Sequence, residues 1–289
     1  MTRRNAAGLL LAGLTGSMLS LVGTTASVVL PSAYAAEDAV CGETVLPETE
    51  VLAGSKAKAN PPLERMHVPQ ALAVTDGRGV KVAVLDSGIQ PGLGISQSGA
   101  SLVLAGLSRV LLSGHGTIVG SLISGTDGVA PGAQVIDVRV FDTADADVSQ
   151  GEKAVTSQGI ADGIRQAIAL HRTNPFQVVN ISLSVGTDDP TLRQAVKDLL
   201  KLDVVVVASA GNADPDAPES FEGTADNDAE VYPGDYPGVL AVSAAPPPGG
   251  ASIGSVVPNQ DTDVAAPTLG AISVNANGQR CAIDQVMAD

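Results

Sequence analysis

The sequence contains no tryptophan, and its other aromatic residues are only three tyrosines and three phenylalanines. This scarcity excludes a surface built for stacking on nucleic-acid bases. Basic residues are also scarce, with 16 Lys+Arg against 31 Asp+Glu and a net charge of −15. Nucleic acid and anionic membrane surfaces repel such a charge, so we expect neither as a partner.

Acidic residues are missing from the first 36 positions, where the only charged side chains are Arg3 and Arg4. Residues 8–23 form an apolar stretch, and Ala33-Tyr34-Ala35 then supplies the small residues that signal peptidase requires. This pattern predicts a signal peptide over residues 1–35 and a mature protein that is secreted or lies at the extracytoplasmic cell surface. The alternative is a signal anchor that stays in the membrane, although the apolar stretch is short and interrupted by glycine.

Cysteine and histidine are rare, with two and three copies. Because exported cysteines usually pair, we expect a disulfide between Cys41 and Cys281 that fastens the N-terminal extension to the end of the domain. Closing so long a loop would stabilise the fold by roughly 4–5 kcal/mol on the chain-entropy model. Two free buried thiols are the alternative. With three histidines and no Cys-x-x-Cys motif, the sequence predicts no metal site, and we expect no cofactor.

Apolar residues make up 44% of the chain, which excludes disorder, and the length suits one large domain. Residues 36–78 include a polar, proline-rich stretch and are interpreted as an N-terminal arm. From residue 79 to residue 289, short apolar runs alternate with helical periodicity. Strands are expected at 80–85, 135–141, 178–182, 204–208 and 239–244, and helices at 115–124, 156–171 and 192–202.

This alternation predicts an α/β fold with a central, mainly parallel sheet and helices on both faces. Ligands of such sheets bind at the carboxyl ends of the strands. Asp86 directly follows one expected strand, and Asn212 lies just beyond another. His115 begins an expected helix between two glycines.

Together these three residues suit acyl transfer by a hydroxyl nucleophile. A carboxylate orients an imidazole base, and a side-chain amide donates to the developing oxyanion. The helix N-terminus disfavours a protonated His115 and a nearby carboxylate favours it, so the two can hold the histidine ready as a base. Each residue alone is weak evidence, because strand-end Asp-x-Gly and Gly-Asn are common in turns and a helix-start histidine is often a cap or core residue.

The segments around these residues resemble those of the subtilisin-like serine proteases. The matching segments, in the family's order, are 82–88, 114–117, 128–133, 179–183, 208–212 and 263–267. The resemblance covers about residues 65–275 and implies a three-layer subtilisin-like fold and a polypeptide substrate. It also implies that Asp86 orients the histidine, that His115 is the general base and that Asn212 is the oxyanion donor.

The resemblance further implies that Ser182 and Leu183 belong to the strand that pairs with the substrate backbone. The family's usual next residue is glycine, whereas this sequence has Ser184. The leader, the cysteine-bearing arm and residues 65–79 look most like the mycosin branch, found beside actinobacterial type VII secretion systems. We therefore expect an association with such a system, and a monomer.

The family's nucleophile is not found in the sequence. Subtilases carry it in a Gly-Thr-Ser-x-Ala-type motif shortly after the Ala-Ala-Pro segment, and no serine after Asn212 has that context. Ser273 lies in an apolar, strand-like run and is interpreted as structural. The expected function is a secreted subtilisin-like serine endopeptidase, present as a truncated or mispredicted chain that ends before its catalytic serine and lacks the nucleophile helix. We expect this chain to be inactive, and either poorly stable or marked by an open apolar groove.

Two other functions compete with this one. The first is a catalytically inactive protease-like domain that binds peptides or partners; the second, an unrelated α/β binding protein, is disfavoured by the ordered motifs. Residues 250–254 match the nucleophile elbow of α/β-hydrolases, but that fold needs a histidine after the serine, and the last one here is His171. His67 and His171 are interpreted as surface residues. The acidic loop at 213–236 is a solvated surface in the simplest interpretation; the sharper hypothesis is that it favours basic peptides.

Overall fold

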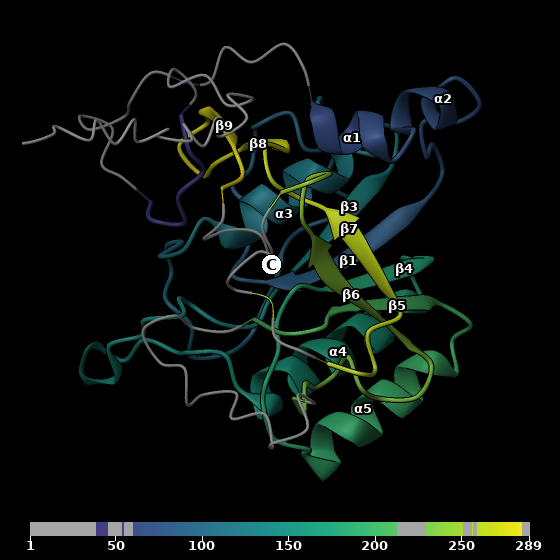
Figure 1. Cartoon of the computed structure of the whole chain (residues 1–289). Coiled ribbons are helices and arrows are strands. Elements are labelled where there is room, and N and C mark those ends of the chain that lie inside the picture. The colour runs from purple at the N-terminus through teal and green to yellow at the C-terminus, as the bar shows by residue number, and fades with distance from the viewer. Residues whose placement is uncertain are drawn as a thin grey trace, which may run out of the picture. The chain divides into compact units, whose positions relative to one another are not determined.

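Figure 1 shows the computed structural model, which describes residues 39–45, 54, 60–212, 229–250, 256 and 259–284. The chain divides into residues 1–33 and 34–289, and every described residue belongs to the second part. The expected signal peptide, most of the acidic loop and most of the 250–254 motif therefore lie outside the described residues. Within the described part of the chain, no helix is long and apolar enough to cross a membrane.

A seven-stranded sheet forms the centre of the fold, in the order β2-β3-β1-β4-β5-β6-β7. Every neighbouring pair in it runs parallel. The expected parallel α/β sheet is therefore confirmed, and the carboxyl ends of its strands share one edge. The strands are β1 (Lys81–Asp86), β2 (Leu102–Val103), β3 (Gln134–Arg139), β4 (Val178–Ile181), β5 (Val205–Ser209), β6 (Val239–Ala245) and β7 (Val264–Pro267).

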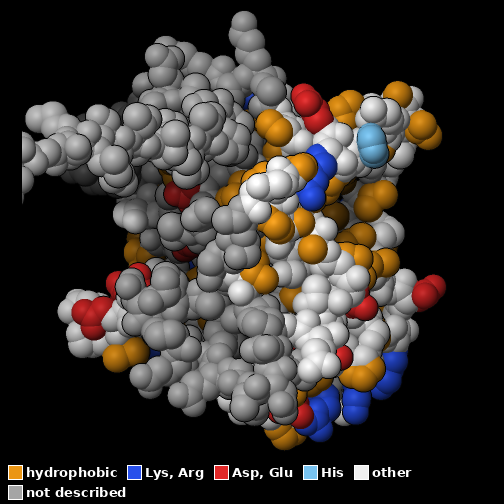
Figure 2. All heavy atoms as spheres, in the orientation of Figure 1, with side chains coloured by type: hydrophobic (Ala, Val, Ile, Leu, Met, Phe, Trp, Pro, Cys, Tyr) orange, Lys and Arg blue, Asp and Glu red, His pale blue; other side chains and the backbone are white. Residues whose placement is uncertain are grey.

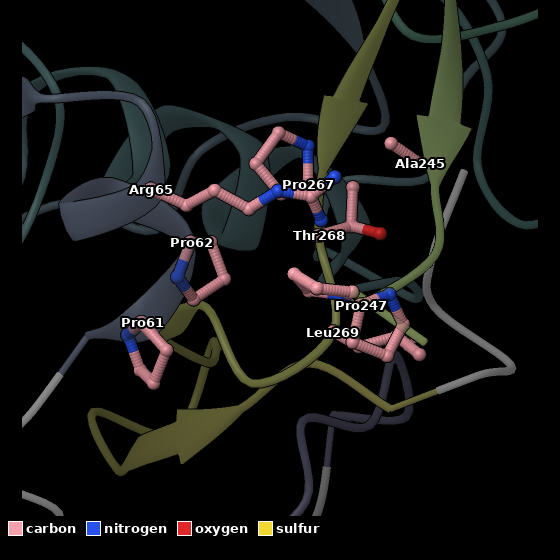
Figure 3. A pocket seen from close by; sticks show the side chains of 9 residues that line it. Pro61, Pro62, Arg65, Ala245, Pro247, Pro267, Thr268 and Leu269 are labelled. Carbon is pink, nitrogen blue, oxygen red and sulfur yellow. The ribbon is translucent and has the colours of Figure 1, made fainter. Parts of the chain in front are cut away.

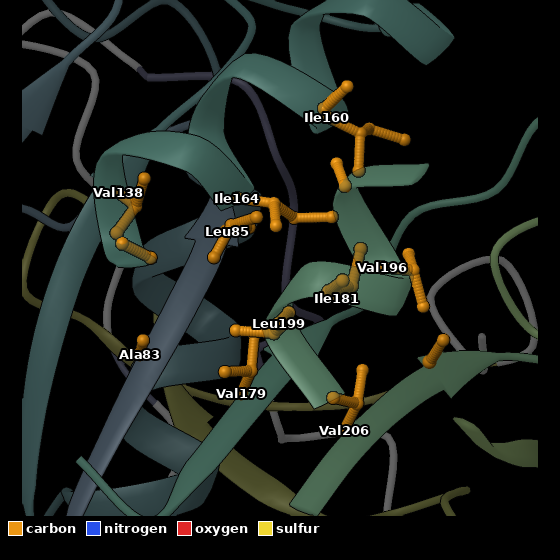
Figure 4. Close-up of a cluster of buried hydrophobic side chains, with 14 of the residues drawn as sticks. Ala83, Leu85, Val138, Ile160, Ile164, Val179, Ile181, Val196, Leu199 and Val206 are labelled. Atoms are coloured by element: carbon orange, nitrogen blue, oxygen red, sulfur yellow. The ribbon is translucent and has the colours of Figure 1, made fainter. Parts of the chain in front are cut away.

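Alternation along the strands separates two apolar layers. Ala83 and Leu85 of β1 belong to the large core cluster formed with α4 (Ser157–His171) and α5 (Pro190–Leu200). Figure 4 shows this cluster, in which side chains from the strands meet those of the two helices. Val82 and Val84 point to the other face, toward α3 (His115–Ser124). Since successive side chains of a strand point to opposite faces, one apolar run serves both layers.

Helices α4 and α5 begin at capping residues that the apolar pattern does not mark. The Thr156 side chain accepts a hydrogen bond from the Gly159 amide and caps α4. Asp189 caps α5 by accepting from two amides of its first turn, and Pro190 follows at the first helical position. Proline suits that position because its missing amide would have no partner there. Helix α5 therefore starts two residues before the expected range and ends at Leu200.

A small antiparallel hairpin of β8 (Ile272–Val274) and β9 (Arg280–Ala282) packs on α3, away from the main sheet. The Ser273 hydroxyl is fully buried and donates to the Ile118 carbonyl at 2.9 Å. Ser273 therefore has the structural role expected of it. Ile118 also belongs to a small apolar cluster with Ala271 and both cysteines.

The N-terminal arm lies against this hairpin. The disulfide between Cys41 and Cys281 is present, and Val40 pairs with Ala282 in a parallel bridge. Within the expected arm of residues 36–78 the chain forms a short helix, α1 (Pro61–Arg65), that the sequence analysis does not predict. A second short helix, α2 (Val68–Leu72), follows. Both helices have proline in the first turn, where it favours a helical start, so these prolines mark helices rather than extended chain.

One face of the sheet carries exposed apolar side chains at β5, β6 and β7. Val205, Leu240 and Val264 are 53%, 37% and 46% exposed. Strand alternation and register place them on the face opposite Val206 and Val239, which pack under the helices. Figure 2, in the orientation of Figure 1, shows apolar side chains spread over this side of the molecule.

Candidate active site

Asp86 and His115 meet at the carboxyl edge of the sheet. Asp86 is the last residue of β1 and His115 is the first residue of α3. Nδ1 of His115 lies 2.8 Å from Oδ1 and 2.9 Å from Oδ2 of Asp86, and the Asp86 side chain is fully buried. Because a carboxylate can only accept hydrogen bonds, Nδ1 carries the proton and Nε2 is the nitrogen able to act as a base.

The turn after β1 and the turn before α3 are tied together by Ser87. Its amide donates to Asp86 Oδ1 at 2.6 Å. Its hydroxyl accepts from the Gly116 amide at 3.0 Å and donates to the Ser113 carbonyl at 3.1 Å. Gly116 must lack a side chain here, because a Cβ would lie 2.6 Å from the Gly88 carbonyl oxygen and 2.9 Å from Asp86 Oδ1. The Ser-Gly and Gly-His-Gly sequences therefore serve close packing of two backbones.

Asn212 follows β5 through a turn that two side chains hold. Gly211 has φ +98°, a conformation that favours glycine, and its amide donates to the Ser209 hydroxyl at 3.1 Å. The Asn259 amide group donates to the Ala210 carbonyl at 3.2 Å and to Asp235 Oδ1 at 2.9 Å. The backbone that leads to Asn212 is thus fixed from a loop almost fifty residues downstream.

A cavity of about 140 Å³ joins these elements. His115, Asn212, Ser182 and Leu183 all line it, while Asp86 is buried in contact with the imidazole. The structure thus brings together every residue for which the sequence predicts a role in catalysis or substrate binding, and their roles stay predictions. The remaining lining residues are Glu43, Phe141, Ala144, Val155, Ser184 and Ser209.

A buried ion pair behind the site was missed from the sequence. Arg139 pairs in register with Asp86 and is 4% exposed; its Nη2 donates to Asp142 Oδ1 at 2.8 Å. The guanidinium also donates to the carbonyls of Ser108 and Val110, both at 2.9 Å, which holds the loop that leads to His115. The signal was present as charged residues inside the apolar run VIDVRVFD, where burial requires a partner.

Glu43 and Asn259 were also missed. Glu43 lies in the N-terminal arm, for which the sequence analysis predicts only a disulfide. No local sequence pattern links Glu43 to His115. Asn259 contacts the turn before Asn212 only through the tertiary fold. Neither residue has a sequence signal that could have found it.

Asp137 of β3 is a buried acid close to the pair. It is 5% exposed, and burial raises the pKa of its carboxyl, with the Asp86 charge adding to the rise. Hydrogen bonds from Ser101 and the Ile89 amide oppose the rise but do not cancel it. Two carboxylates therefore lie beneath the site: that of Asp86 is bound to His115, and that of Asp137 has a disfavoured ionised form.

The other two histidines lie elsewhere. His67 is exposed, as expected. His171 is only half-exposed, because its ring packs edge-on against Phe176 with centroids 4.5 Å apart, and its Nδ1 accepts from the Phe176 amide at 3.4 Å. His171 thus lies partly at the surface, as expected, and its ring also packs at the end of α4.

A second cavity, of about 240 Å³, lies between α1 and the ends of β6 and β7 (Figure 3). Its wall is mostly proline, and Arg65 crosses it to donate to the Pro246 carbonyl at 2.7 Å. None of the residues predicted for catalysis or substrate binding lines it, so the chemistry belongs to the smaller cavity.

The sheet order, the Asp–His pair and the asparagine at the same edge define a protein of the subtilisin type. Residues 77–284 match the model of the subtilase family, peptidase family S8. The chain therefore belongs to the subtilase family.

Among curated proteins, the chain is 34% identical over 190 residues to the minor extracellular protease Epr of Bacillus subtilis (strain 168), covering 63% of this chain and 26% of that protein. It is 39% identical over 145 residues to subtilisin BL of Lederbergia lenta, covering 47% of this chain and 49% of the relative. The chain thus spans between a quarter and a half of the length of these relatives.

Solved structures show the same fold. MycP1 with its N-terminal propeptide removed has a TM-score of 0.59 and 24% identity, covering 78% of this chain and 75% of that chain. MycP1 from Mycobacterium smegmatis has a TM-score of 0.60 and 21% identity, covering 84% and 70%. The prenylagaramide maturation protease PagA has a TM-score of 0.57 and 22% identity, covering 76% and 75%. At these identities the likeness concerns the fold alone.

Proposed function

We propose that this chain is the part of a secreted subtilisin-like serine endopeptidase that carries the general base and the oxyanion donor. The observation that carries the proposal is the buried Asp86 carboxylate bound to Nδ1 of His115, with Asn212 lining the same cavity. Secretion is supported by the leader-like first 35 residues and by relatives such as the extracellular protease Epr.

In this mechanism the substrate backbone lies beside Ser182 and Leu183 at the end of β4. Nε2 of His115 takes the proton of a serine hydroxyl as that oxygen attacks the scissile carbonyl carbon. Asp86 stabilises the imidazolium that forms, and the Asn212 amide donates to the oxyanion. The imidazolium then protonates the leaving amine, and water repeats the sequence on the acyl group.

The serine of this mechanism is not identified among these 289 residues. The sequence has no Gly-Thr-Ser-x-Ala motif, and two of the three serines that line the cavity are hydrogen-bonded within the fold. Ser182 donates to Asn180 Oδ1 at 3.2 Å, and Ser209 accepts from the Gly211 amide. We propose that these 289 residues alone, in which no nucleophile is identified, do not hydrolyse peptides.

The test begins with the DNA beyond the codon for Asp289. If it encodes a Gly-Thr-Ser-x-Ala segment, a protein extended through that segment should react with a fluorophosphonate probe and cleave casein. The extended protein with His115→Ala should do neither, and the 289-residue chain should remain unlabelled. Failure of a folded extended protein to label or cleave would contradict the proposed endopeptidase.

A second candidate function is a protease-like domain that binds peptides or partners without cleaving them. The exposed Val205, Leu240 and Val264 on one sheet face favour it, because adjacent exposed apolar side chains are typical of interaction surfaces. Peptide binding without labelling, even in the extended protein, would support this function. We also infer a link to a type VII secretion system, supported by the MycP1-like fold, and we expect a monomer by analytical ultracentrifugation.

A further inference from the structure

We propose that Glu43 of the N-terminal arm is a specificity-determining residue of the cleft, which selects substrates that place a lysine or arginine beside the His115 turn. The inference rests on the proposed function, since it names the substrate class of the same site. It depends on three observations: how the arm is fixed, where the carboxylate lies, and which charges surround the cavity.

The arm is fixed to the domain on both sides of Glu43. Cys41 is joined to Cys281, and the Cys41 amide donates to the Ala282 carbonyl at 2.9 Å. On the other side, Thr44 pairs with Ser113 in an antiparallel bridge. The Glu43 carbonyl itself accepts from the Gly114 amide at 2.5 Å. Glu43 is therefore held in the wall of the site by contacts of residues 41–44 that do not involve its side chain.

The Glu43 side chain lies at the turn that carries the base. The Ser113 hydroxyl donates to Glu43 Oε2 at 3.4 Å and accepts from the His115 amide at 3.2 Å. Glu43 and His115 line the same cavity, and Glu43 is half-exposed. The carboxylate is thus oriented by Ser113 but remains within reach of a bound peptide.

The charges around the cavity favour a cation. Glu43 is the only acidic side chain among the described residues that line it, and none of those residues is Lys or Arg. The buried Asp86 carboxylate lies behind the imidazole, and the chain carries a net charge of −15. A partly desolvated carboxylate attracts an ammonium or guanidinium group more strongly than one in bulk water, so a basic substrate side chain gains most at this point.

The experiment measures peptide binding to the purified 289-residue chain, which needs no nucleophile. Fluorescein-labelled peptides carry a single lysine that is moved along an otherwise neutral sequence, and each is compared by anisotropy with its norleucine counterpart. We expect lysine at one register to bind about three- to tenfold tighter than norleucine, with the preference shrinking at high ionic strength. Glu43→Gln should abolish the preference, so that each lysine peptide and its norleucine counterpart bind with equal affinity.

Glu64→Gln is the matched control, because Glu64 is an exposed glutamate of α1 and its substitution changes the net charge equally. It should retain the lysine preference. A preference that persists in Glu43→Gln, or that Glu64→Gln loses equally, overturns the role of Glu43. Binding of peptides with no lysine preference in the unmodified chain overturns it as well, while leaving the proposed function intact. Absence of binding by every peptide would instead contradict the proposed function itself.

Discussion

Both carboxylate oxygens of Asp86 lie within hydrogen-bond distance of Nδ1 of His115, at 2.8 and 2.9 Å, and the Asp86 side chain does not reach solvent. The pair joins the last residue of a central strand to the first residue of a helix. A side chain on a rigid strand thus sets the orientation of a side chain on a rigid helix. This arrangement specifies which imidazole nitrogen carries the proton.

Asp86→Asn should reverse that assignment. An amide can present its NH₂ group to Nδ1, which would make Nδ1 an acceptor and move the ring proton to Nε2. We expect the ¹⁵N shifts of the His115 ring to exchange their protonated and unprotonated positions. In an extended protein that carries the serine, kcat should fall by about 10⁴-fold, the known order for this change in serine proteases.

Asp198→Asn is a suitable control for Asp86→Asn, because Asp198 lies on the outer side of α5 and pairs with Lys201. It should leave the His115 shifts unchanged. Identical ring shifts in Asp86→Asn and the unmodified chain would mean that Asp86 does not set the tautomer.

Gly116→Ala should destabilise the protein and displace His115. The added methyl group would meet the Gly88 carbonyl and the Asp86 carboxylate, and neither belongs to a flexible side-chain end that could move aside. We expect the free energy of unfolding to fall by about 1–3 kcal/mol, the usual cost of overpacking. Gly42→Ala is the control, because a Cβ there meets nothing within 4 Å. Equal urea midpoints for the two variants would contradict this account of the Gly-His-Gly turn.

The disulfide should contribute strongly to stability because it joins residues 240 positions apart. We expect the Cys41→Ser/Cys281→Ser double variant to lose about 2–5 kcal/mol of unfolding free energy, measured by guanidinium denaturation. Reduction of the unmodified chain should give the same loss, whereas the double variant should not respond to reductant. Reductant that leaves the midpoint of the unmodified chain unchanged would contradict the prediction.

The sheet and its edge could be predicted because the relevant signals are local. An apolar run such as residues 204–208 indicates a strand whose two faces are both buried. An apolar stripe such as that of residues 118–123 indicates a helix that packs one side on the sheet. Because the strands are parallel, Asp86 and Asn212 come to the same edge of the sheet. The observed helix boundaries differ from the expected ones by one or two residues where a capping residue determines the start, as Asp189 does for α5. The short helices α1 and α2 were missed because each is only five residues long, too short for helical periodicity to show.

The parts of the site that could not be predicted depend on contacts between distant segments. Glu43 meets Ser113 across 70 residues, and Asn259 meets Ala210 across 49. Neither pairing leaves a periodic or compositional trace. Arg139 differs from Glu43 and Asn259 because its signal is local. A charged residue inside an apolar strand indicates a buried ion pair, and its partner Asp142 is only three residues away.

Asp137→Asn should stabilise the protein at neutral pH, and the gain should disappear in acid. Burial and the nearby Asp86 raise the pKa of Asp137 in the folded state above its unfolded value of about 3.8. The folded state therefore binds this proton more tightly than the unfolded state, so ionisation of Asp137 lowers stability as pH rises through the folded pKa. Asparagine removes the charge, can still accept from the Ile89 amide, and avoids that loss.

The measurement is the melting temperature of both proteins from neutral pH down to below the unfolded pKa. Asp137→Asn should melt higher than the unmodified chain at neutral pH, and the two curves should converge as Asp137 becomes protonated. Asp145→Asn is the matched control, because Asp145 is exposed and its substitution should give no such pH-dependent difference. A constant offset at all pH values would mean that packing, rather than the charge of Asp137, determines the effect, since only ionisation makes the difference depend on pH.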